Sequence, residues 1–157
     1  MIFVTVGTQI PFDRLIKIID ELAPELGGEE IIAQTSECAR YAPRNFRTVG
    51  FLPPDRFNDI FNRARLVVAH AGMGTIISAL RQAKPLIIFP RKASLGEHRN
   101  EHQLATAAEM EKLGAVAVAY DADDLRRLLT GGADLTPGTI SPTPSATLID
   151  AIREYIG

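Results

Sequence analysis

Short apolar runs alternate with stretches of helical spacing, and this alternation limits the folds open to the chain more than any other feature. The runs lie at 2–6, 31–33, 46–49, 66–69, 86–89 and 115–119. They are apolar along most of their length rather than at every second position, which is typical of parallel strands covered on both faces. Amphipathic stretches separate them, at 15–22, 54–61, 75–82, 98–112 and 121–129. Because strand–helix–strand units wind right-handedly, the sequence predicts an α/β fold with a Rossmann-like, doubly wound parallel sheet.

Length and composition favour one soluble domain. A chain of 157 residues is too short for two full α/β domains. Hydrophobic residues make up 46% and charged residues 23%, as in ordinary globular proteins. The formal net charge of −2 lacks the basic excess of a nucleic-acid-binding protein, so we expect no nucleic-acid partner.

The compartment follows from what the chain lacks. Its one cysteine, Cys38, has no partner for an internal disulfide, which favours a reducing compartment. The first residues carry no basic segment with a long apolar stretch behind it, so we expect no signal peptide. No apolar run reaches the ~18 residues that a membrane span needs. We therefore expect a cytoplasmic protein that is held at a membrane only through another molecule.

The last quarter of the chain departs from the strand–helix pattern. Residues 130–144 are rich in glycine, proline, threonine and serine and read as a linker between the domain at 1–129 and a helix at 145–157. In that helix Leu148, Ile152 and Tyr155 form one apolar stripe. Such a short helix is marginal alone in water, so it must dock on its own sheet or on a partner, and the sequence favours neither.

Three strand-to-helix junctions carry the candidate chemistry, because ligands bind at the carboxyl ends of strands in open α/β sheets. The first junction is Gly7-Thr8-Gln9. The second, at 70–75, reads His-Ala-Gly-Met-Gly-Thr. Its glycines allow close backbone approach, and the amides of 74–76 at a helix N-terminus suit an anion. The spacing matches neither G-x-G-x-x-G nor a Walker A loop, and a glycine turn without ligand is an equal alternative from this motif alone.

The third junction is a basic loop from 91 to 103. It gathers cations with polar partners: Arg91, Lys92, Glu97, His98, Arg99, Asn100, Glu101, His102 and Gln103. Cations suit phosphate, whereas amides and carboxylates suit sugar hydroxyls. A solvated loop is the plain alternative. A remote one is the zinc-peptidase motif H-x-x-E-H at 98–102, whose two histidines would share a metal on one helix but lack a third ligand.

Five pieces of the chain together resemble the C-terminal, donor-binding domain of family 28 glycosyltransferases. They are 4–9, 49–52, 70–75, 84–85 and 97–103, in the right order over most of the chain up to about residue 119. The likeness is strongest to stand-alone versions of that domain, which serve the second N-acetylglucosamine addition to dolichol diphosphate and bacterial capsule or exopolysaccharide synthesis. The run 97–103 looks most like the exopolysaccharide subunits. The resemblance implies the C-terminal half of a GT-B fold.

The resemblance also implies a role for each matching position. Phe51 and Leu52 would hold uracil, residues 72–75 would hold the diphosphate, and His102 and Gln103 would read the sugar. Ser78 stands where many relatives place a ribose-binding glutamate, which leaves its role in doubt. The expected donor-binding set is Gly7, Thr8, Gln9, Phe51, Leu52, His70, Gly72, Met73, Gly74, Thr75, Ser78, Arg91, Arg99, Asn100, His102 and Gln103.

The function implied is that of a UDP-sugar-binding subunit of a two-component inverting glycosyltransferase. It would transfer a sugar to a lipid-diphosphate-linked saccharide in exopolysaccharide or capsule synthesis. Its partner would be a membrane-anchored acceptor-domain subunit, which would hold the chain at the inner face of the membrane. We expect no metal and no cofactor besides the UDP-sugar co-substrate. His70, Glu97 and His98 are the candidate bases, and a non-catalytic nucleotide-sugar-binding or activator subunit is the alternative.

Overall fold

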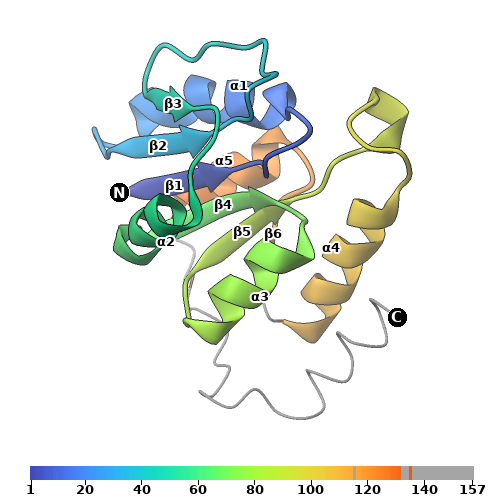
Figure 1. The fold of residues 1–157 in the computed structure, drawn as a ribbon. Helices are drawn as coiled ribbons and strands as arrows, with labels where there is room; N and C mark the ends of the chain where they lie inside the picture. The colour runs from blue at the N-terminus through green and yellow to red at the C-terminus, as the bar shows by residue number, and fades with distance from the viewer. Residues whose placement is uncertain (115, 132–134, 136–157) are drawn as a thin grey trace.

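Six parallel strands form one sheet in a computed structural model that describes residues 1–114, 116–131 and 135 (Figure 1). The strands are β1 (Ile2–Thr5), β2 (Ile31–Gln34), β3 (Arg47–Val49), β4 (Leu66–His70), β5 (Leu86–Phe89) and β6 (Ala117–Val118). Their order is β3-β2-β1-β4-β5-β6, and every neighbouring pair is parallel. The chain therefore winds outward from β1 in both directions, which confirms the predicted doubly wound, Rossmann-like sheet.

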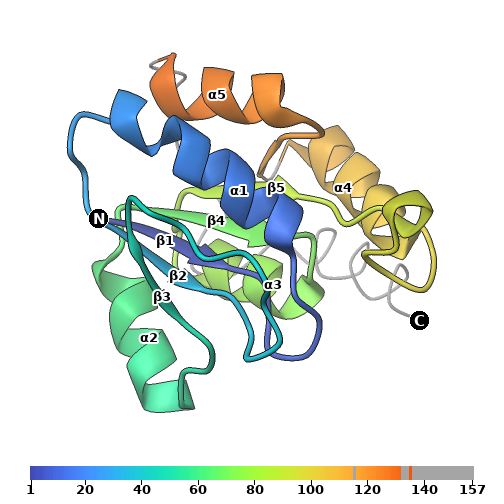
Figure 2. The same cartoon turned by 90° about the horizontal axis from the view of Figure 1, so that it is seen from above.

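Helices cover both faces of this sheet (Figure 2). Two of them, α1 (Asp13–Leu22) and α5 (Ala122–Thr130), share one buried cluster with Ile2 and Val4 of β1. The other face buries Phe3 against α2 (Pro54–Arg63), α3 (Met73–Arg81) and α4 (His102–Leu113). Successive residues of β1, β2, β4 and β5 thus enter opposite cores, which explains why these strands are apolar along most of their length, whereas Arg47 and Thr48 of the edge strand β3 are exposed.

Two short 3₁₀ turns complete the described chain, η1 (Ala23–Glu25) and η2 (Ala93–Leu95). The helix predicted at 98–112 starts later than expected: residues 98–101 form bends, and α4 begins only at His102. The Asn100 side-chain oxygen accepts the His102 backbone N–H at 2.9 Å, and such local bonds compete with helix formation. The helix predicted from residue 75 begins two residues earlier, at Met73.

The predicted linker at 130–144 and helix at 145–157 lie almost wholly outside the described residues, so those predictions stand as made. No helix among the described residues is both long and apolar enough to cross a membrane.

Candidate functional site

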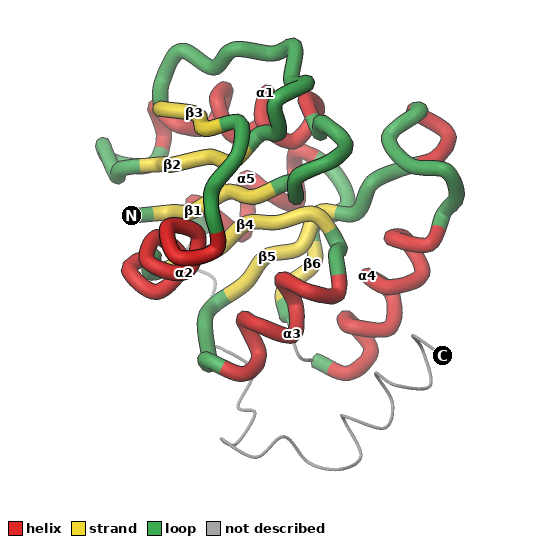
Figure 3. The backbone as a smooth tube through the Cα atoms, in the orientation of Figure 1, coloured by secondary structure: helices red, strands yellow, loops and turns green. Residues whose placement is uncertain are grey.

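The loops that follow β1, β4 and β5 meet at one end of the sheet, because all strands run in the same direction (Figure 3). Two hollows open there. The Phe51 cavity, of about 380 Å³, is lined by Thr5, Gly7, Thr8, Gln34, Phe51, Leu52, Pro54, Phe57, Asn58 and Thr75. The His70 cavity, of about 220 Å³, is lined by Val6, Gly7, Thr8, Gln9, Ile10, His70, Arg91, His98 and Gln103. Gly7 and Thr8 border both, so the loop after β1 divides one site into two halves.

Gly7 of the first junction and Gly72 of the second leave the space that the His70 ring occupies. Gly7 has φ +81°, and a Cβ there would lie 3.3 Å from His70 Nε2. At Gly72 a Cβ would lie 2.5 Å from His70 Cε1, closer than real Cβ atoms approach. Both positions therefore need glycine, the first for its left-handed backbone and the second for the space that the imidazole ring occupies.

The backbone N–H groups at the N-terminus of α3 are hydrogen-bond donors that no side chain caps. Helix α3 begins after Gly72 with no side-chain cap, and Ile76 N–H donates to the Gly72 carbonyl at 3.2 Å. The uncapped amides are therefore those of 73–75, and the expectation that Ile76 contributes one is wrong. Gly74 has no protein atom within 4 Å of a Cβ built on it, so the space beside these amides is open.

Gln103 fixes the orientation of His70 rather than standing free. It is buried, and its Oε1 accepts the backbone N–H groups of Ala71 at 3.2 Å and Arg91 at 3.0 Å. Its Nε2 therefore faces His70 Nδ1, at 3.1 Å. Because an amide nitrogen only donates, Nδ1 accepts, and the proton of the neutral imidazole sits on Nε2.

The charge state of His70 agrees with this arrangement. Burial, with smaller contributions from the charges of Arg91 and His98, lowers the pKa of His70 to about 4. At neutral pH the ring is thus uncharged, with its lone pair occupied by Gln103 and its N–H beside Gly7 and Gly72. His70 is placed to donate a hydrogen bond into the cavity and has no free lone pair with which to act as a base.

Arg91 is committed to the loop after β1. Its guanidinium donates to the carbonyls of Val6 and Ile10 at 2.7 Å and of Pro11 at 2.8 Å, and it lies over the Phe12 ring at 4.7 Å. Burial lowers the pKa of Arg91 to about 10, which leaves it charged at neutral pH. The side chain is buried and borders the His70 cavity, but most of its donors are used to shape the loop.

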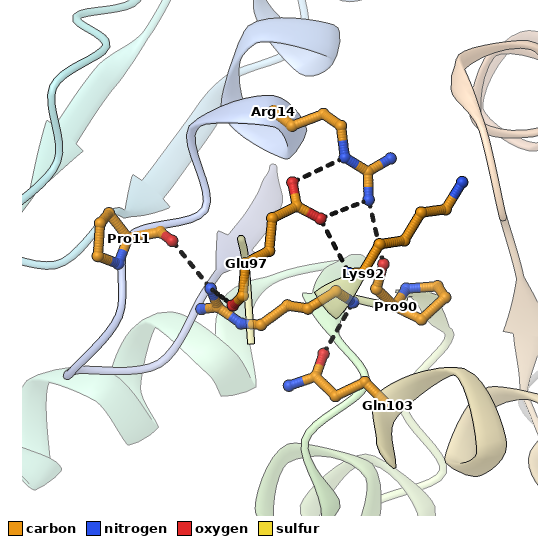
Figure 4. Close-up of polar contacts among 7 residues, drawn as sticks. Pro11, Arg14, Pro90, Lys92, Glu97 and Gln103 are labelled. Carbon is orange, nitrogen blue, oxygen red and sulfur yellow. Dashed lines mark hydrogen bonds and ion pairs between the residues drawn. The ribbon is translucent and has the colours of Figure 1, made fainter. Parts of the chain in front are cut away.

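Glu97 is likewise paired (Figure 4). Its carboxylate faces Arg14, with Nε–Oε2 at 2.8 Å and Nη2–Oε1 at 2.9 Å, and it also accepts the Lys92 backbone N–H at 2.9 Å. Arg14 lies over the Phe89 ring at 4.5 Å. A carboxylate held by a bidentate cation is poorly suited to take a proton, so Glu97 positions the basic loop. Arg14, 83 residues away on α1, carried no local signal in the sequence.

The remaining predicted residues divide into two groups. The cavities are lined by Thr8, Gln9, Phe51, Leu52, Thr75 and His98. Ser78, Arg99, Asn100 and His102 line neither, and the last three are exposed. Gln34 and Asn58 line the Phe51 cavity without having been predicted.

The metallopeptidase alternative loses its premise. His98 precedes α4 and only His102 belongs to it, so the two histidines do not lie one turn apart on a helix. Within 1–114, 116–131 and 135, no group of three or more His, Cys, Asp or Glu side chains is placed to hold a metal ion.

Comparison with known proteins agrees with this geometry. Residues 1–136 match the glycosyltransferase family 28 C-terminal domain. The chain belongs to glycosyltransferase family 28. It is 42% identical over 84 residues to the UDP-N-acetylglucosamine transferase subunit ALG13 of Eremothecium gossypii. The aligned stretch covers 53% of this chain and 38% of that protein. The chain thus spans under half the length of this relative.

Two solved structures share the fold of this family 28 domain. The NMR solution structure of ALG13 has a TM-score of 0.65 at 18% identity and covers 99% of this chain and 96% of its own. The glycotransferase of kitacinnamycin has a TM-score of 0.62 at 19% identity, over 99% of this chain but 39% of its own. The fold is therefore equivalent to one half of a GT-B glycosyltransferase, as predicted.

Proposed function

We propose that this family 28 domain binds a UDP-sugar as the donor half of a two-component inverting glycosyltransferase. The observation that carries the proposal is the uncapped N-terminus of α3 at residues 73–75, of which Thr75 borders the Phe51 cavity. A helix N-terminus with free amides suits a diphosphate, through both hydrogen bonds and the helix dipole.

The two cavities suit the two ends of such a donor. The Phe51 cavity offers a wall of Phe51, Leu52 and Phe57 for a flat, apolar nucleoside face. The His70 cavity offers polar groups, among them Thr8, Gln9 and the His70 N–H, for sugar or phosphate oxygens. In this proposal the diphosphate would lie at the boundary formed by the Gly7–Thr8 loop, next to the amides.

In this scheme the chain stabilises the leaving group rather than activating the nucleophile. The amides of 73–75 and the neutral His70 N–H would offset the charge that develops on the diphosphate as the glycosidic bond to it breaks. The acceptor hydroxyl would be brought to the anomeric carbon by a partner subunit, since proximity supplies much of the rate in group transfer. The relative's name, a transferase subunit, supports a partner.

The identity of the base that takes the acceptor proton separates the proposed function from a second one. Glu97 is held by Arg14 and the His70 lone pair by Gln103, which leaves His98 as the candidate that borders the cavity. This pairing favours the alternative in which the chain binds the nucleotide-sugar and the partner supplies the base. Activity of the complex that survives His98→Asn would assign the base to the partner.

The donor sugar, the acceptor, the pathway and the location of the protein are further proposals, and their support differs. UDP-N-acetylglucosamine is the first donor to test, because the Eremothecium gossypii relative is named for it. A lipid-diphosphate-linked acceptor, a place in exopolysaccharide or capsule synthesis, and attachment to the cytoplasmic face of a membrane through the partner rest on the sequence resemblance. So does the absence of a metal or other cofactor.

Calorimetry with UDP and the full chain tests the donor site. Gly74→Val adds a side chain in open space beside the free amides, so it should abolish UDP binding without a clash inside the protein. Ala108→Val, at an exposed position of α4, is the matched control and should bind UDP as the wild type does. Equal UDP affinity in the Gly74→Val variant would remove the diphosphate from this helix end.

A further inference from the structure

Gln34 combines burial with unused hydrogen-bond donors. It ends β2, is only 1% exposed, and borders the Phe51 cavity. Its backbone carbonyl accepts the Val6 N–H at 3.2 Å, and its side-chain Oε1 accepts the Thr5 hydroxyl at 2.8 Å. Its side-chain nitrogen has no hydrogen-bond partner among the residues that the structure describes.

The hydrogen-bond chain into Gln34 determines which way its amide is turned. The Gly7 N–H points at the Thr5 hydroxyl oxygen, at 3.5 Å, so this oxygen acts as an acceptor there. The Thr5 hydroxyl donates its proton to Gln34 Oε1, and its oxygen still has a lone pair for the Gly7 N–H. This orientation leaves the two N–H groups of the amide available to an acceptor in the Phe51 cavity, which Gln34 borders.

We infer that Gln34 is a ligand-binding residue that donates a hydrogen bond to an oxygen of the nucleoside held in the Phe51 cavity. The inference deepens the proposed function and rests on it. Thr75 marks the α3 end of this cavity, where the diphosphate is proposed to lie. Gln34 shares the lining of this cavity with the apolar side chains of Phe51 and Phe57, which suit a flat ring, so we assign the ring portion of the ligand to Gln34.

Two variants separate this role from a structural one. Gln34→Glu keeps an oxygen for the Thr5 hydroxyl but removes the donors. The double variant Thr5→Val with Gln34→Met replaces both polar partners by apolar groups of similar size, which folded proteins tolerate far better than the loss of one partner. Gln82→Glu, at the exposed far end of α3, makes the same chemical change away from the cavity.

The experiment is calorimetric titration of the full-length variants with UDP, 2′-deoxy-UDP and inorganic diphosphate, alongside thermal unfolding. Both cavity variants should bind UDP roughly tenfold more weakly than the wild type, as expected for a lost buried hydrogen bond, and Gln82→Glu should be unchanged. The double variant should bind inorganic diphosphate as the wild type does. If its penalty vanishes with 2′-deoxy-UDP, Gln34 contacts the ribose 2′ oxygen; if it persists, Gln34 contacts another nucleoside oxygen.

Two results would overturn the inference while leaving the proposed function intact. One is UDP affinity in the folded double variant within twofold of the wild type. The other is an equal loss of affinity for UDP and inorganic diphosphate, which would move the contact off the nucleoside. Failure of the wild-type chain to bind UDP at all would remove the proposed function, and this inference with it.

Discussion

The junction after β4 and the junction after β5 are neighbours at the same end of the sheet, yet they use their polar groups in opposite ways. After β4 the amides of 73–75 have no side-chain cap, and His70 presents an N–H to a cavity. After β5 the charged side chains bind one another and the backbone, as in the pairs of Glu97 with Arg14 and of Arg91 with the loop carbonyls. The difference teaches that a high density of charge does not by itself mark open binding groups, because charged side chains can be used up by protein partners. We therefore look for the proposed binding surface among polar groups that lack protein partners.

The largest expected effect comes from Arg91, if the basic loop is structural. Arg91→Ala would leave the carbonyls of Val6, Ile10 and Pro11 without their donor and should lower the free energy of unfolding by about 3 kcal/mol or more. Arg99→Ala, at an exposed position of the same loop, should change it by less than about 0.5 kcal/mol. Urea denaturation measures both, and similar losses in the two variants would contradict the contrast.

A second prediction uses the pH dependence of His70. Its pKa is lowered from the ordinary 6.5 to about 4, so the folded state resists protonation of this ring. Its stabilising contribution is therefore full above pH 6.5 and declines as the pH falls toward 4, by about 3 kcal/mol at most. Stability measured by urea denaturation between pH 7 and 4 should show this decline, and His70→Asn should remove most of it. A His70 ring that titrates near 6.5 by NMR would contradict the lowered pKa and the stability change expected from it.

The smallest expected effect concerns Glu97. Glu97→Gln weakens the ion pair with Arg14 but keeps a side chain of the same size, so unfolding should become easier by about 1 kcal/mol. Because this carboxylate positions a loop, activity of the reconstituted complex should fall only a fewfold. A loss of activity of roughly a thousandfold with an unchanged melting temperature would instead restore Glu97 as the catalytic base.

Much of the fold was predictable because its strands enter two cores and are apolar on both faces. The start of α4 was not, since the bond from Asn100 to His102 depends on a local turn that the helical spacing at 98–112 does not reveal. Within the site, Gly7, His70 and Thr75 follow from their places after strands. Gln34 carried a comparable signal, a polar residue at the end of the apolar run 31–33, and it was overlooked. The role of Arg14 depends on a partner 83 residues away, which no local pattern shows.

Chemical-shift mapping of the ¹⁵N-labelled chain during titration with UDP tests the central contrast most directly. The backbone amides of 73–75 and the side-chain N–H of His70 should shift together and saturate at one ligand concentration. The amides of 98–101 and the guanidinium of Arg99 should move little. Large saturable shifts confined to the basic loop, with the amides of 73–75 unmoved, would show that the charged loop binds the diphosphate and that the open helix end does not.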